Sequence, residues 1–462
     1  MFRNIAQYVR RRRPPLTKAV RIATAAAGLG VCTPWSGFAQ ETRSRPTGVL
    51  TLQEVLDSAL AQHPLAQAAV ARVRAARGAL TTARAFGNPV LNYDVENAPF
   101  PGGDPVAGMA RESMTTAMLP LETIFQRGPR ARRADAEVHA SEADASNARQ
   151  QLALDAARTY FRTALAQVSV DAARDLTTWL DSVVAYNRAR VEQGVAAEAD
   201  LIRAELERDR SAAAATLREA ALARARAQLG AFLGDGTRPA GDLVVGVDDA
   251  PLAMPALLAA RAAEWRADVM GRPDVRAARA RLTASEFGVS RERSMIIREL
   301  SATIGTKRSA GTTSMMAGLS VPLPVFDPNR GEIVRASAER DAAALDLAAQ
   351  ERTALGELNG AYDAARLLTE RTALLARGSD GRPPFLARAD EARRIALGAY
   401  REGAASLLQV IDAARAWNEA RLAFYETMYA QHESIAALIV AHGDDLLTEL
   451  PPLATRGRAI PR

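Results

Sequence analysis

The hydrophobic and polar positions of the chain alternate in two ways, with a helical spacing of three to four residues and a strand spacing of two. Segments of the two kinds follow one another in the same order twice along the chain. Apolar residues recur at steps of three and four over long runs, which is typical of helices. Residues 90–97 and 298–305 instead alternate apolar and polar positions, which is typical of strands. A second candidate strand follows each, at 112–121 and 314–323, before a very long helical run begins. The pattern therefore predicts two tandem repeats of helix, strand, strand, long helix and helix.

Two glycines mark equivalent points of the repeats. Gly194 and Gly403 lie 209 residues apart, and each interrupts a helical run. Both are followed at the same offset by an apolar pair, Leu201-Ile202 in the first repeat and Val410-Ile411 in the second. A glycine between two helical runs is typical of a helix end. We therefore expect a turn between two helices at each glycine.

The predicted domain organisation places the two repeats between short, loosely structured ends. A stretch rich in glycine and proline separates the repeats, as is typical of a linker. The predicted segments are a signal peptide at 1–39, an N-terminal tail at 40–50, the first repeat at 51–233, a linker at 234–255, the second repeat at 256–443 and a C-terminal tail at 444–462.

The net charge of +6 is concentrated near the N-terminus. Seven lysines and arginines and no acidic residue precede residue 40, so the remaining chain has a formal charge of −1. This distribution excludes the nucleic-acid-binding class that a basic chain suggests. The apolar segment from Ile22 to Cys32 is too short to span a membrane. With the small residues around Ala39, it predicts a secretory signal peptide.

Cys32 is the single cysteine of the chain. The sequence from Leu29 to Cys32 resembles a lipoprotein box, in which the cysteine is acylated, although Val31 is larger than the usual residue there. Cleavage after Ala39 is the alternative, and it leaves a mature chain without a cysteine or a disulfide. Lipidation at Cys32 therefore stays open.

The four predicted strands have apolar faces that no amphipathic helix is available to cover. A sheet in lipid cannot keep open edges, because each unpaired backbone group costs several kcal/mol. Membrane barrels begin at about eight strands, so several copies would have to pool their strands. Two copies or three would each close a barrel.

The sequence shows no catalytic motif. It lacks a phosphate-binding loop and a Gly-x-Ser-x-Gly turn, and its four histidines lack the spacing of metal-ligand pairs. We predict a protein that is not an enzyme and has no cofactor and no metal site. Several methionines near the strands suit soft metals, but packing is the favoured interpretation because a site needs converging ligands. They are Met109, Met114, Met118, Met315 and Met316.

Residues of about 50–443 resemble the TolC outer membrane efflux family. The resemblance rests on the repeats, the two glycine turns and several motifs, which are Leu119-Pro120-Leu121-Glu122, Gly128-Pro129-Arg130 and the stretch from Val321 to Glu332. That last stretch contains proline, phenylalanine, asparagine and glycine. It resembles the equivalent stretch in the branch of the family that serves heavy-metal resistance-nodulation-division pumps.

The resemblance implies a fold that combines helices with a membrane β-barrel. A homotrimer would form a 12-stranded barrel in the outer membrane from four strands per chain, continued by a periplasmic coiled-coil barrel. The resemblance implies a passive conduit that carries heavy-metal cations to the exterior and is fed by a periplasmic adaptor and an inner membrane resistance-nodulation-division pump. Alternatives are a duct for drug efflux or type I secretion and, in another class, a soluble periplasmic coiled-coil adaptor or scaffold. The scaffold leaves the paired strands without a purpose.

The resemblance also implies two sets of site residues at the periplasmic tip. The adaptor-contact set is Gly194, Val195, Gly403 and Ala404, and the constriction set is Asp200, Tyr400, Leu407, Leu408, Gln409 and Asp412. Ala405 stands where the family prototype has a gating arginine, and Gln409 where it has an aspartate. We therefore expect a weaker charge lock, with apolar narrowing by Leu407 and Leu408. Asp200 also suits a helix N-cap.

Overall fold

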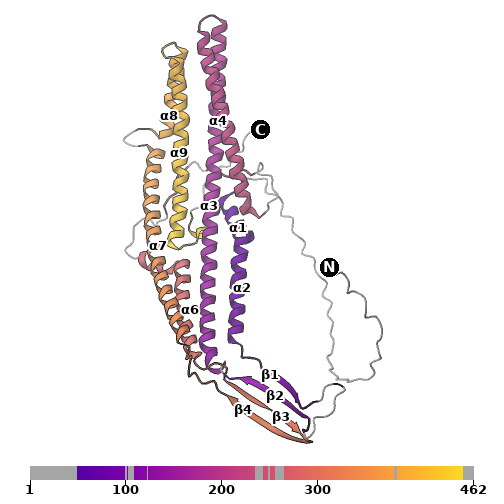
Figure 1. Ribbon diagram of the computed structural model, residues 1–462. Helices are drawn as coiled ribbons and strands as arrows, with labels where there is room; N and C mark the ends of the chain where they lie inside the picture. Colours follow the sequence, from indigo (N-terminus) through magenta and orange to yellow (C-terminus); the bar gives the residue numbers. More distant parts are fainter. Residues whose placement is uncertain are drawn as a thin grey trace, which may run out of the picture. The chain divides into compact units, whose positions relative to one another are not determined.

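The computed structural model describes residues 49–98, 101, 109–121, 123–234, 243–247, 250–254, 265–378 and 382–450 (Figure 1). The predicted signal peptide, Cys32, most of the N-terminal tail, much of the linker and the end of the C-terminal tail lie outside these residues.

The first half of the described chain begins with a capped helix and includes one helix of 70 residues. Thr51 and Glu54 form a capping box at the start, in which the Thr51 amide donates to the Glu54 carboxylate at 2.8 Å. The elements are α1 (Leu52–Gln62), α2 (Pro64–Arg84), β1 (Val90–Glu96), β2 (Glu112–Pro120), α3 (Thr123–Glu192), α4 (Glu198–Gly230) and the 3-10 helix η1 (Ala231–Leu233). At 1.5 Å per residue, α3 is about 105 Å long.

The second half repeats this order with one change. Its long helical run is divided into two helices, and Gly378 after the first has a φ of 78°. The elements are α5 (Trp265–Gly271), α6 (Pro273–Ser294), β3 (Ser301–Ser309), β4 (Thr312–Ser320), α7 (Arg330–Arg377), α8 (Phe385–Arg401), α9 (Leu407–His442) and α10 (Leu446–Glu449).

Strand β3 differs from its predicted range of 298–305. It begins at Ser301 and continues to Ser309, into the residues between the strands predicted at 298–305 and 314–323. Gly305 pairs with Thr116 of β2, and a Cβ at Gly305 would collide with the Thr115 carbonyl oxygen. The glycine therefore allows the close approach of two strands and does not end one.

The four strands form one antiparallel sheet in the order β1-β2-β3-β4, in which β2 pairs with β3 and so joins the two halves (Figure 1). One face carries Leu91, Tyr93, Ile304 and Met315, all strongly exposed. The edges at β1 and β4 have no partner strand within the described residues. In that same part of the chain, every helix is too short or too polar to span a membrane.

The main hydrophobic core lies where α1, α3, α7 and α9 meet. Phe161 of α3 and Met428 of α9 are fully buried there, beside Leu56 and Leu358. The Tyr160 hydroxyl donates a hydrogen bond to the carbonyl oxygen of Leu50 or Gly246, each at 3.2 Å. This core holds the two long hairpins of the chain, α3 with α4 and α8 with α9, at their base.

Candidate functional site: two packed helical hairpins

Both predicted glycine turns join antiparallel helices. Gly194 lies between α3 and α4 with a φ of 73°, and Gly403 lies between α8 and α9 with a φ of 79°. The amide of Val195 donates to the Arg190 carbonyl at 2.9 Å, and the amide of Ala404 donates to the Ala399 carbonyl at 2.8 Å. Open space surrounds both glycines, so the left-handed backbone, and not crowding, requires glycine here.

The first turns after the two glycines differ in how they are capped. Ser406 caps α9, and the side-chain oxygen of Gln409 accepts from the Ser406 amide at 2.9 Å to complete a capping box. Residue Ala197 is the N-cap of α4 and has no side-chain cap. The expectation that Asp200 caps α4 is therefore wrong, because the helix begins earlier and places this residue within its first turn.

Tyr400 lies in the contact between the two hairpins. Its side chain is buried, and its hydroxyl donates a hydrogen bond to the side-chain oxygen of Asn187 on α3. The ring meets Tyr186 edge-on at 5.9 Å between centroids, and the Arg190 guanidinium lies 5.6 Å from the Tyr400 ring centre. Burial raises the pKa of the Tyr400 phenol. Tyr400 therefore fastens α8 to α3.

The other predicted constriction residues have different surroundings. Leu407 is buried with Val183, Ala204 and Val410 between the hairpins, whereas Leu408 is half exposed. The remaining two are acidic: Asp200 is partly exposed, and Asp412 is exposed with its carboxylate 3.8 Å from the Arg415 guanidinium. The structure thus brings Tyr400 and Leu407 into one apolar contact and leaves Leu408 and Asp412 on the surface of the chain.

An ion pair that the sequence analysis missed joins the hairpins farther from the tips. Arg415 of α9 donates two hydrogen bonds to the carboxylate of Glu207 on α4, one of them at 2.7 Å. The Glu207 side chain is 14% exposed and the Arg415 side chain 40%, so the carboxylate is largely shielded from solvent while the guanidinium stays partly in contact with it. A signal was available: the two opposite charges lie at nearly equal distances from Gly194 and Gly403.

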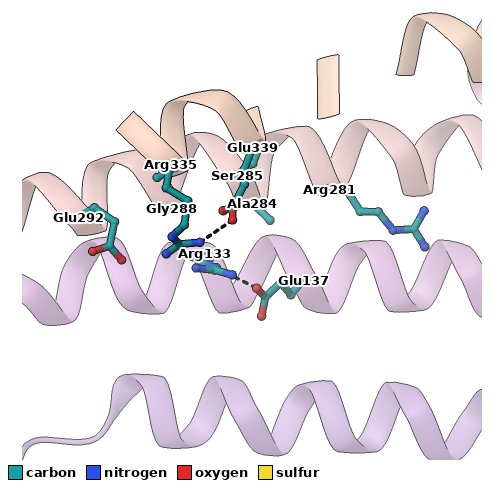
Figure 2. Close-up of a pocket in the computed structure, with 10 residues that line it drawn as sticks. Arg133, Glu137, Arg281, Ala284, Ser285, Gly288, Glu292, Arg335 and Glu339 are labelled. Atoms are coloured by element: carbon teal, nitrogen blue, oxygen red, sulfur yellow. Dashed lines mark hydrogen bonds and ion pairs between the residues drawn. The ribbon is translucent and has the colours of Figure 1, made fainter. Parts of the chain in front are cut away.

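A charged cavity of about 200 Å³ lies elsewhere, between α3, α6 and α7. Figure 2 shows Arg133 directed at Glu137 and Arg335 directed at Glu339, and the first of these pairs has a distance of 2.9 Å. Arg281, which also lines the cavity, pairs with Asp144 at 2.6 Å. Because each of these arginines is already paired with a carboxylate, the cavity has little net charge with which to bind a charged ligand.

The methionines near the strands do not converge. Met315 and Met316 are neighbours on β4, so they point to opposite faces of the sheet, and Met114 lies across from Lys307. Within the described residues, no group of three or more histidine, cysteine, aspartate or glutamate side chains is arranged to hold a metal ion.

Comparisons with known proteins agree on one protein family. The model of the outer membrane efflux protein family matches residues 55–235 and 270–444. The cobalt-zinc-cadmium resistance protein CzcC of Cupriavidus metallidurans is 24% identical over 380 residues, which cover 82% of this chain and 86% of CzcC.

Two solved structures share the fold. CusC has a TM-score of 0.71 at 18% identity, covering 85% of this chain and 92% of its own. The outer membrane protein VceC of Vibrio cholerae has a TM-score of 0.71 at 19% identity, covering 86% and 96%. The predicted combination of long helices and a four-stranded sheet, the outer membrane location and the family resemblance are thereby confirmed. The chain belongs to the outer membrane efflux protein family.

Proposed function

We propose that three copies of this chain form the outer membrane duct of a tripartite efflux system. The observation that carries this proposal is the sheet, whose two edges at β1 and β4 are unpaired among the described residues. In lipid these edges need partners, and the β4 edge of one copy can pair with the β1 edge of the next. Three copies then supply twelve strands, above the minimum of about eight for a membrane barrel.

The long helices would continue the barrel into the periplasm. We assign the two repeats to residues 51–233 and 256–443, supported by the repeated order of elements. The two hairpin turns, with Gly194, Val195, Gly403 and Ala404, would meet the periplasmic adaptor, which connects the duct to a resistance-nodulation-division pump. Transport energy would come from the pump, so the chain acts as a passive conduit.

The hairpin contacts suggest how the tip is held. Tyr400 and Leu407 would keep the α8–α9 hairpin against α3 and α4, while Leu408, Asp200 and Asp412 would narrow the passage. Gln409 would act mainly by capping α9, because its side chain is engaged with Ser406. Ala405 near the turn carries no charge, so a charged link between the hairpins would come from pairs farther along the helices, such as Arg415 with Glu207.

Heavy-metal cations are the proposed cargo. The support is the similarity over most of the chain to CzcC, whose name records resistance to cobalt, zinc and cadmium. A drug-efflux duct would share the same barrel and helices, so growth tests must separate the two cargo classes.

Deleting the gene should lower the tolerance of the host to zinc, cobalt and cadmium salts, and the full-length gene should restore it. Minimum inhibitory concentrations measure this effect, with lipophilic antibiotics as the comparison class. Loss of antibiotic tolerance with unchanged metal tolerance would reject the metal cargo and retain the duct. The purified protein should be a heat-modifiable trimer from the outer membrane fraction. Recovery as a soluble periplasmic monomer contradicts the duct itself.

A further inference from the structure

Large apolar side chains are exposed where the second strand of each half passes into its long helix. Between β4 and α7, Leu323 is 77% exposed, Val325 72% and Phe326 99%. At the start of α3, just after β2, Ile124 is 71% exposed. We call these four residues the collar. Isolated exposed apolar residues need no explanation, but a cluster of this kind marks a contact surface.

The two parts of the collar occupy equivalent positions. Ile124 and Phe326 lie 202 residues apart, the same offset that separates Pro120 from Pro322 at the ends of the two strands. The same position of each half therefore presents a large apolar side chain to the surroundings.

The collar continues the apolar face of the sheet. Along β4 and beyond it, every second residue is apolar, and these residues are Met315, Ala317, Leu319, Val321, Leu323 and Val325. The ladder between β3 and β4 ends at Ser320. Pro322 and Pro324 have no N–H group, so they cannot extend the hydrogen bonding. The alternation of apolar residues thus continues past the last paired residue of β4. Pairing between strands does not require it there, so we expect these side chains to contact another surface.

The length of the sheet places the collar at one rim of the membrane. Strands β3 and β4 have nine residues each, or about 30 Å at 3.3 Å per residue. A tilt of roughly 40° reduces this length to about 23 Å, close to the apolar band of about 25 Å on membrane barrels. The collar follows at the helical end, where side chains meet the boundary between acyl chains and head groups.

Two arginines adjoin the collar: Arg127 follows Ile124 by three residues on α3, and Arg298 pairs with Asp327, the residue after Phe326. The Arg127 guanidinium lies 4.6 Å from the ring centre of exposed Phe86, and Arg298 lies 3.7 Å from the Asp327 carboxylate. An arginine whose apolar stem lies next to an aromatic ring, as Arg127 does, is typical of membrane interfaces, where its charge reaches lipid head groups.

We infer that the collar inserts into the periplasmic leaflet of the outer membrane, with phospholipid at the boundary of acyl chains and head groups as its partner. The inference rests on the proposed barrel. Lipid is favoured over a second copy because neighbouring copies approach β4 at its edge, whereas Leu323 and Val325 continue its face. The collar would hold the barrel at a fixed depth without using strand residues.

Tryptophan fluorescence in vesicles of brominated phosphatidylcholine tests the inference. Phe326→Trp in the full-length protein should be quenched most by lipid brominated near the head-group end of its acyl chains. Ile124→Trp should behave in the same way and serves if Phe326→Trp does not assemble. The native Trp179, Trp265 and Trp417 lie in the helical part, so the unmodified protein supplies the baseline.

Two further variants separate the possible outcomes. Leu345→Trp, exposed in the middle of α7, should show no quenching above the baseline. Tyr93→Trp, on the apolar face of β1, should be quenched by lipid brominated deep in its chains if the barrel exists. Quenching of Tyr93→Trp without quenching at residues 326 and 124 overturns the collar alone. Absence of quenching at all three positions overturns the barrel as well.

Discussion

At the scale of single residues, His432 is the most unusual side chain of the core. It is fully buried on α9, with ring centroids of Phe161 at 5.4 Å and Tyr429 at 5.5 Å. Burial in these surroundings lowers the pKa of His432 to about 4 from 6.5. The imidazole is therefore neutral in the folded chain at neutral pH, and folding would favour its deprotonated form.

Acid should destabilise the helical part through His432. Because the pKa is lower in the folded state than in the unfolded state, the stabilisation is complete above about pH 6.5 and is lost as the pH falls towards about 4. The loss amounts to ~3 kcal/mol. Replacing His432 with Leu should flatten the thermal stability between these pH values, as followed by circular dichroism.

The matched control for this experiment is His139→Gln, because His139 on α3 is exposed. This variant should keep the pH dependence of the unmodified protein. An equal pH slope in His432→Leu and in the unmodified protein would show that other groups cause the acid sensitivity.

At the scale of elements, glycine has two different roles that sequence alone separates poorly. Gly194 and Gly403 were correctly predicted as helix ends because strongly helical runs flank them. Gly305 ends the strand predicted at 298–305, but it lies within β3 and permits the approach of Thr116. The difference is tertiary: only the neighbouring strand shows that the glycine relieves a collision.

The contact between the two hairpins could also be predicted only in part from the sequence. The repeat located both turns and pointed to Tyr400, but it could not show that Tyr400 and Leu407 lie buried between hairpins. Nor did it pair Tyr400 with Asn187, since those residues lie 213 positions apart and on helices of different halves. Helical periodicity identifies an apolar stripe but does not identify the helix that covers it.

Replacing Gly403 with Ala should weaken the α8–α9 hairpin by about 1 kcal/mol, because a side chain at a φ of 79° is strained. Gly78→Ala is the control, since Gly78 lies within α2 with open space around it, and alanine there should stabilise by roughly 1 kcal/mol. Hydrogen exchange of α9 amides near the turn measures the first effect. Equal protection in Gly403→Ala and the unmodified protein would contradict it.

At the scale of the whole molecule, the two hairpins are joined by contacts of different kinds along their length. Tyr400 and Leu407 form an apolar contact near the turns, and Arg415 binds Glu207 farther away. Arg421 of α9 pairs with Asp175 of α3 at 2.5 Å, farther still. The acids nearest the tip keep some contact with solvent: Asp200 is partly exposed, and Asp412 is exposed with its carboxylate 3.8 Å from the Arg415 guanidinium. Both carboxylates can therefore act on passing ions in the proposed duct.

Reversing these two charges should change ion selectivity. In planar bilayers, Asp200→Lys with Asp412→Lys should reduce the preference for cations, because three copies would replace six negative charges near the proposed constriction with positive ones. Asp209→Lys, on the exposed side of α4, is the control for a charge change away from the constriction. Unchanged reversal potentials in the double variant would remove both aspartates from the passage.

The open edges of the sheet also have a genetic consequence. If every barrel closes through the strands of its neighbours, one defective copy damages the two intact copies that share its assembly. In a cell that makes intact and defective chains in equal amounts, only about one trimer in eight would contain intact chains alone. A variant that still pairs its strands but blocks the passage should therefore be dominant, whereas a variant that cannot fold should be recessive.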